Sequence, residues 1–146
     1  GVAFVPIPSL KNSGVYGATK WINKDKNDKV VLGITNRGKS ADIFWFSLFH
    51  ELRHVIQRKI TKTIVDFVDD LNDDDYEKEA NQFAKDLLIP PMDYELFIAH
   101  PPFSEQKIRD FAVSIKVHPG MVVGRLQKEE RLPYTHLNKL KQKCAF

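Results

Sequence analysis

The stretch "FWFSLFHELRH", residues 44–54, contains the pattern H-E-x-x-H and decides how the rest of the chain is interpreted. His50 and His54 are four residues apart, so on a helix they project from one face, one turn apart. Two imidazoles with this spacing suit a single metal ion, and Glu51 beside them is placed to take a proton from a metal-bound water. The competing interpretation is a pair of solvated or core-satisfied histidines. Residues 43–49 are apolar on nearly every side, which predicts a buried helix. Charged side chains in a buried helix cost free energy unless they are paired or bind a metal, so the cluster indicates a function.

Residues 33–40, "GITNRGKS", fit a second catalytic pattern, the phosphate-binding loop G-x-x-x-x-G-K-[ST]. The fold around such a loop needs several parallel strands joined by crossover helices, and no convincing strand follows residue 70. We therefore interpret Gly38 as a turn glycine, Lys39 as solvated and Ser40 as a helix N-cap. Nucleotide binding stays a distant alternative, which an ATP-binding measurement would test.

Short strand-like stretches come before the helix and indicate a small antiparallel sheet, because turns separate them in the sequence. The first, "VAFVPI", is interpreted as an edge strand because prolines end its apolar run. A further strand or hairpin arm is expected after the H-E-x-x-H helix. The predicted strands are 2–7, 14–22, 29–35 and 61–70, with residues 1–35 mainly strands.

Helices are predicted for most of the remaining chain. The H-E-x-x-H helix is expected at 40–57, and a second helix at 74–89 ends where two prolines follow it. Residues 92–146 are also predicted to be helical. A sheet followed by helices is an α+β pattern, in which the small sheet packs on the H-E-x-x-H helix. The length predicts one domain, 1–146.

A metal site of this kind needs a third protein ligand, and a carboxylate on the second helix is the candidate. Glu77 and Asn81 share a helix face, so Glu77 can bind the metal while Asn81 supports a ligand by a hydrogen bond. Glu79 competes for the role but points about 200° away from Glu77 around the helix. Glu77 lies with the packing residues Ala80 and Ala84, so we prefer Glu77. The alternative is that both acids are solvated residues of the first helical turn.

Composition limits the classes of function. A content of 42% apolar and 28% charged residues is typical of a globular protein, and a net charge of +3 is too mild to predict direct binding of nucleic acid. No apolar run reaches the roughly 20 residues that span a bilayer, so no membrane partner is expected. Cys144 is the single cysteine, which excludes an internal disulfide and favours a reducing, cytoplasmic location. The chain begins at Gly1 without an initiator Met, and we expect a fragment of a longer protein.

Two motifs together carry a family resemblance. "FWFSLFHELRHVI" followed by "EKEANQFAKDLLIPP", residues 77–91, resembles the ImmA/IrrE family of metallo-endopeptidases. The stretches "GVYGATKWI" and "HPGMVVGRLQ" look like the branch that is fused to helix-turn-helix antitoxin or repressor proteins. The resemblance implies a zincin-like fold with a zinc ion held by His50, His54 and Glu77. It implies Glu51 as the catalytic base.

The resemblance also implies a substrate. Relatives are thought to cut a partner repressor between its DNA-binding and oligomerisation parts, so we expect a zinc-dependent endopeptidase with a repressor-type protein substrate or a fused helix-turn-helix domain as partner. One position departs from the family: Arg53 stands where Gly is usual. A long cation there could block the cleft or repel metal. The alternative function is therefore a catalytically weak or inactive regulatory domain of a helix-turn-helix antitoxin or transcription regulator.

Peptide cleavage needs a hydrogen-bond donor for the oxyanion that develops on the carbonyl. Four residues in the last third of the chain are unranked candidates: His100, His118, Tyr134 and His136. The alternative for each is a surface or packing role. The sequence does not define the oligomeric state, and a homodimer stays open.

Overall fold

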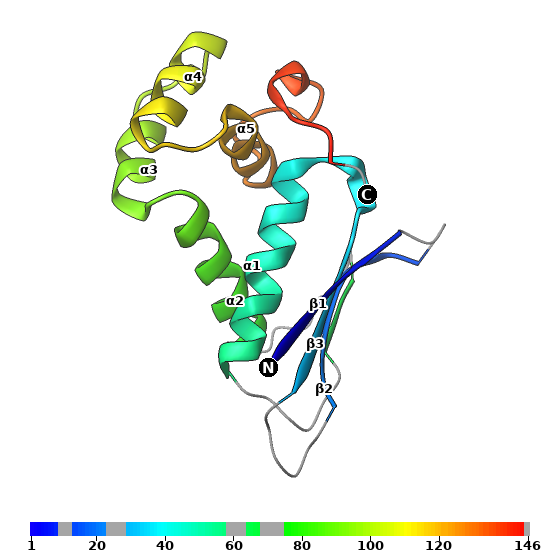
Figure 1. Ribbon diagram of the computed structural model, residues 1–146. Coiled ribbons are helices and arrows are strands. Elements are labelled where there is room, and N and C mark those ends of the chain that lie inside the picture. The colour runs from blue at the N-terminus through cyan, green and yellow to red at the C-terminus, as the bar shows by residue number, and fades with distance from the viewer. Residues whose placement is uncertain (9–12, 23–28, 58–63, 68–74, 145–146) are drawn as a thin grey trace.

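Among the residues that the structure describes, the sheet has four strands in the order β1-β3-β2-β4 (Figure 1). The computed structural model describes residues 1–8, 13–22, 29–57, 64–67 and 75–144. β2 pairs antiparallel with both β3 and β4, as predicted, but β1 runs parallel to β3. The expectation of a wholly antiparallel sheet is therefore wrong: β1 does not form a hairpin with β2 and lies on the opposite side of β3. The strands are β1 (Val2–Ile7), β2 (Val15–Trp21), β3 (Val30–Thr35) and β4 (Ile64–Phe67).

β1 is an edge strand, as the prolines in its sequence predicted. Pro6 stands opposite Ile34 of β3, and a residue without an N–H is tolerated in a sheet at such an edge. All six residues of β1 are exposed. Its position leaves β2 and β3 as the central strands on which a helix can pack.

In the described part of the chain five α-helices follow or flank the sheet, so the predicted α+β class is confirmed (Figure 1). The H-E-x-x-H helix and the helix that carries Glu77 both lie within two residues of their predicted bounds. Single 3-10 turns lie at Arg37–Lys39, where Gly38 has the positive φ of a turn glycine, and at Asn138–Leu140. The helices are α1 (Ala41–Gln57), α2 (Asp75–Leu88), α3 (Pro91–Ile98), α4 (Glu105–Ser114) and α5 (Pro119–Lys128).

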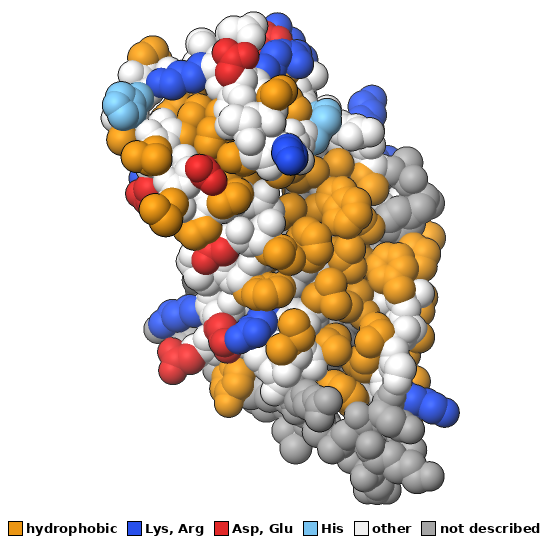
Figure 2. All heavy atoms as spheres, turned by 60° about the vertical axis from the view of Figure 1, so that its left-hand side comes forward, with side chains coloured by type: hydrophobic (Ala, Val, Ile, Leu, Met, Phe, Trp, Pro, Cys, Tyr) orange, Lys and Arg blue, Asp and Glu red, His pale blue; other side chains and the backbone are white. Residues whose placement is uncertain are grey.

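α1 lies between the sheet and the other helices, in contact with β2 and β3 on one side and with α2 and α5 on the other (Figure 1). The helix was predicted to be buried, and this holds only in part. Its buried side chains are mostly polar, while Trp45 and Ile56 are 42% and 56% exposed. The sheet and the other helices cover the polar face of α1, and its apolar side chains are partly buried or exposed. Figure 2 shows hydrophobic side chains gathered over a broad face of the molecule.

A second packed region joins α3, α4 and α5 to the C-terminal segment. Its centre is the apolar face of α5, where Val122, Val123 and Leu126 are fully buried. The expectation that residues 92–146 are helical is wrong between α5 and residue 144, and residues 145–146 lie outside the described residues. After α5 the buried side-chain amide of Gln127 donates to several backbone carbonyls of the segment 133–136, and Leu137 has a positive φ of 56°. These contacts wrap the segment into turns instead of a helix.

The C-terminal segment crosses the beginning of α1. The N–H of Ala41 donates to the carbonyl of Gln142 at 2.8 Å, and Lys141 pairs with Asp42 at 2.7 Å. A phosphate site needs an open helix N-terminus, and this one is covered by residues of the same chain. The geometry therefore supports the interpretation of residues 33–40 as a turn and helix start. Within the described ranges, every helix is too short or too polar to cross a bilayer.

Candidate metal centre

The three predicted ligands lie together between α1 and α2. His50 and His54 are 2% and 0% exposed, on the face of α1 that meets α2. Glu77, in the first turn of α2, places one carboxylate oxygen 3.1 Å from Nε2 of His50 and the other 3.3 Å from Nε2 of His54. Among the described residues these three form a group that could hold a metal ion, with all ligand atoms within 4.8 Å of one another.

Glu79, the competing candidate, lies away from the histidines. Its carboxylate accepts hydrogen bonds from the guanidinium of Arg53 and, at 2.8 Å, from the side-chain amide of Gln57. These bonds, from Arg53 first, lower the pKa of the Glu79 carboxyl. The helix face predicted for Glu77 is therefore the one that meets the histidines, and its role as a ligand stays a prediction.

Each histidine has an amide oxygen at its other ring nitrogen. Oδ1 of Asn81 lies 3.1 Å from Nδ1 of His50, which is the supporting contact expected for Asn81. Oε1 of Gln57 lies 2.9 Å from Nδ1 of His54. A carbonyl oxygen only accepts, so each Nδ1 carries the proton and each Nε2 presents a lone pair. Gln57 was not predicted, although its position three residues after His54 on one helix face could have indicated it.

The donor set fits a metal ion. Nε2 of His50 and Nε2 of His54 are 3.0 Å apart, and a carboxylate faces both. Lone pairs and a negative charge this close repel one another unless a cation lies among them. Ligands about 2.0–2.1 Å from a tetrahedral ion are roughly 3.3–3.4 Å apart, close to the separations here.

A proton can take the place of the ion. An Nε2–H on either histidine would donate to Glu77, and these hydrogen bonds, from His50 first and His54 second, hold the pKa of the Glu77 carboxyl well below its usual range. Metal ions and protons thus compete for the same atoms.

Glu51, the predicted base, is fully buried against β2. Its Oε2 accepts a hydrogen bond of 2.5 Å from the hydroxyl of Thr19. A Cβ at Gly17 would lie 2.7 Å from both Cγ and Oε1 of Glu51, closer than real Cβ atoms approach a neighbour. The glycine makes room for the acid, and the threonine orients it. Neither residue was predicted, because their distance from Glu51 depends on how β2 packs on α1.

Arg53 points toward α2, away from the group of ligand atoms. Its guanidinium pairs with Glu79 and lies over the ring of Phe83, 5.4 Å from the ring centroid. A long cation at this position therefore does not enter the space between His50, His54 and Glu77.

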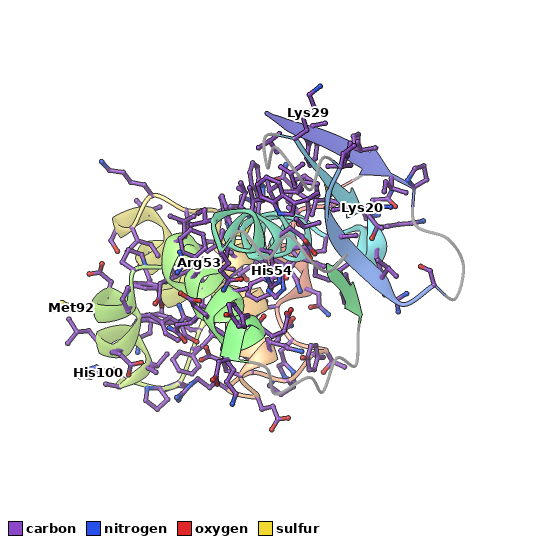
Figure 3. All side chains as sticks on the ribbon, turned by 90° about the horizontal axis from the view of Figure 1, so that it is seen from below. Lys20, Lys29, Arg53, His54, Met92 and His100 are labelled. Atoms are coloured by element: carbon purple, nitrogen blue, oxygen red, sulfur yellow. The ribbon has the colours of Figure 1, made fainter. Side chains whose placement is uncertain are left out.

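The four oxyanion candidates all lie outside this group of ligand atoms. His118 caps α5 by accepting from the N–H of Gly120, and His100 has its Nδ1 3.1 Å from the carbonyl of Leu96. Tyr134 is 63% exposed, and His136 is exposed beside Thr135. Figure 3 shows His100 far from His54. All four side chains are exposed, which is the surface role that was the alternative.

The fold and this donor set agree with a comparison to known families. Residues 8–127 match the model of the IrrE N-terminal-like domain of peptidase family M78. The chain therefore belongs to this family, as the resemblance to ImmA/IrrE proteins predicted. Membership supports a metallopeptidase-type function. No curated protein matches the chain.

Proposed function

We propose that this chain is a zinc-dependent endopeptidase whose ion is held by His50, His54 and Glu77. The observation that carries the proposal is the convergence of two Nε2 atoms and a carboxylate, with both Nδ1 atoms held by amide oxygens. Two neutral imidazoles and one carboxylate are a donor set of catalytic zinc sites, which keep a further position for water.

The residues of the chain divide the chemistry between them. When bound, the ion would supply Lewis-acid activation of a water molecule and of the peptide carbonyl. Glu51 would accept the proton of that water and pass it to the leaving amine. Thr19 holds the Glu51 carboxylate through its hydroxyl, and Gly17 leaves the space that this orientation needs.

The substrate we propose is a repressor-type regulatory protein, and the location is the cytoplasm. Family membership supports this proposal, because the motifs of the chain resemble those of ImmA/IrrE proteins. The alternative partner is a helix-turn-helix domain fused to this chain. We propose no direct role for nucleic acid or membrane at this domain, and a homodimer stays open.

Glu51→Gln tests the peptidase directly. The zinc-loaded chain and the variant are incubated with a proteome-derived peptide library and with a helix-turn-helix repressor, and new termini are identified by mass spectrometry. We expect cleavage by the unsubstituted chain, none by Glu51→Gln, and about one zinc in each. Glu130→Gln, the same change at an exposed residue, is the matched control and should cleave normally.

The outcomes separate two errors. Cleavage by Glu51→Gln at the normal rate would mean that another group is the base. A zinc-loaded chain that cleaves neither probe would contradict the peptidase and leave the regulatory domain as the function.

A further inference from the structure

Gln57, the last residue of α1, connects the proposed metal site to the first turns of α2. Its Oε1 faces Nδ1 of His54 at 2.9 Å. Its amide nitrogen donates to the carbonyl of Tyr76 at 3.2 Å and to Oε2 of Glu79 at 2.8 Å. One amide group therefore joins a buried histidine of α1 to the backbone and a side chain of α2.

The two acceptors determine which way the amide is turned. A glutamine amide has an oxygen that only accepts and a nitrogen that only donates. The carbonyl of Tyr76 and the carboxylate of Glu79 can only accept, so they require the nitrogen on their side. The oxygen must then face His54, whose Nδ1 must carry the proton. The tautomer of His54 follows from its neighbours, with its Nε2 lone pair directed at Glu77 and His50.

Arg53 fixes the position of Glu79, the acid that orients the side-chain amide of Gln57. Its guanidinium donates to Oε1 of Glu79 while Gln57 donates to Oε2, so both carboxylate oxygens are engaged from α1. The ion pair is partly exposed, with side-chain exposures of 25% and 48%, and exposed pairs contribute little to stability. Its effect is therefore on orientation. The residue that departs from the family pattern, Arg53, belongs to this arrangement.

We propose that Gln57 is a positioning residue for the metal: oriented by Glu79, it selects the His54 tautomer whose Nε2 lone pair binds the ion. The inference rests on the proposed metal site and deepens it. Partners of ligand histidines typically change metal affinity by about 10–100-fold when removed. A simpler alternative is that Gln57 only joins α1 to α2.

Three variants distinguish these roles by zinc affinity, measured in competition with a chromogenic chelator. Gln57→Leu removes both functions and should weaken zinc binding by about 10–100-fold. Gln57→Glu keeps an oxygen for Nδ1 of His54 but loses the donor to α2, so its affinity should stay within roughly threefold of the unsubstituted chain. Gln82→Leu is the matched control, because Gln82 is exposed and donates to Asp86. It should bind zinc normally.

The tautomer is also read directly, without metal. Nitrogen-15 NMR of the zinc-free chain at pH 8 should show the proton of His54 on Nδ1 in the unsubstituted chain and in Gln57→Glu. Gln57→Leu should show both tautomers. Glu79→Ala removes the acceptor that orients the Gln57 amide and should weaken zinc binding by a few-fold. This variant takes the place of Gln57→Leu if Gln57→Leu does not fold.

The results that overturn the inference differ from those that overturn the metal site. If the unsubstituted chain binds no zinc, the proposed function is contradicted. If NMR of that chain also places the His54 proton on Nε2, the positioning role of Gln57 is contradicted as well. A chain that binds zinc, with Gln57→Leu equal to it, contradicts the inference alone. If Gln57→Glu binds zinc as weakly as Gln57→Leu, then Gln57 only joins α1 to α2.

Discussion

Nε2 of His50 and Nε2 of His54 lie 3.0 Å apart in a buried space between α1 and α2, and the Glu77 carboxylate reaches both. Amide oxygens of Asn81 and Gln57 hold the opposite ring nitrogens. This arrangement directs two lone pairs and a negative charge at one point. A cation at that point relieves the repulsion, and this is the physical basis of the proposed metal site.

Metal binding should depend on pH through the histidines. The folded-state pKa of Glu77 is lowered from 4.5 by its hydrogen bonds with His50 and His54, so its carboxylate stays ionised as the pH falls from 8 to 5. The imidazoles must lose protons to bind metal. Zinc affinity, measured by chelator competition, should therefore fall with pH, by up to roughly a hundredfold per unit where two protons are displaced. A constant affinity from pH 8 to pH 5 would contradict imidazole ligation.

The same lowered pKa predicts a stability effect in the zinc-free chain. Because the pKa of Glu77 is lower in the folded state than in the unfolded state, its contribution to stability is present above about pH 4.5 and is lost as the pH falls through the folded value. Glu77→Gln should reduce this acid dependence in urea unfolding. An unchanged dependence would mean that the pairing is absent in solution.

Glu77 and Glu79 are expected to differ sharply when each becomes glutamine. Glu77→Gln removes the negative ligand and should lower zinc affinity by at least about a hundredfold, because one of three protein ligands loses its charge. Glu79→Gln keeps an acceptor for Gln57 and should change affinity only a few-fold. Both are measured by calorimetry under the same conditions. Equal losses would argue against Glu77 as the third ligand.

Gly17→Ala should displace Glu51 and leave the metal ligands in place. The added Cβ would lie 2.7 Å from two atoms of the Glu51 side chain, so the acid must move, and a displacement of about 1 Å can cost about a hundredfold in rate. Zinc content should be unchanged. Gly1→Ala is the matched control, since its Cβ meets nothing within 4 Å. Peptide cleavage and zinc content of both variants decide whether the effect is specific to Glu51.

Tyr94→Phe tests the packing of the helical half, apart from the metal site. Burial first, and the hydrogen bond to Glu129 second, raise the pKa of Tyr94. Its hydroxyl donates to Glu129 at 2.8 Å, and Arg125 lies over its ring. Loss of the hydroxyl should lower the free energy of unfolding by about 1–2 kcal/mol in urea titration. Tyr134→Phe, at a residue 63% exposed, should change it by less than about 0.5 kcal/mol.

Features that depend on local periodicity could be predicted from the sequence. The spacing of His50 and His54 and the shared face of Glu77 and Asn81 follow from helical geometry, and the structure places all four at one site. The α+β class likewise follows from the order of strand-like and helix-like stretches.

Features that depend on tertiary packing could not be predicted. Gly17 and Thr19 contact Glu51, which is more than 30 residues away in the sequence. The spacing of residues along the chain does not predict how β2 packs on α1. The parallel pairing of β1 depends on which side of β3 the strand joins. The helix expected near the C-terminus does not form, because the backbone carbonyls of the segment 133–136 accept hydrogen bonds from the buried side-chain amide of Gln127.

We propose that His50, His54 and Glu77 hold one zinc ion, and the metal content of the purified chain tests this. Elemental analysis is made after zinc is supplied and excess removed, for the unsubstituted chain, for His54→Ala and for the exposed control His136→Ala. We expect about one zinc per chain in the unsubstituted chain and in His136→Ala, and almost none in His54→Ala. No zinc in the unsubstituted chain, or equal zinc in His54→Ala, would contradict it.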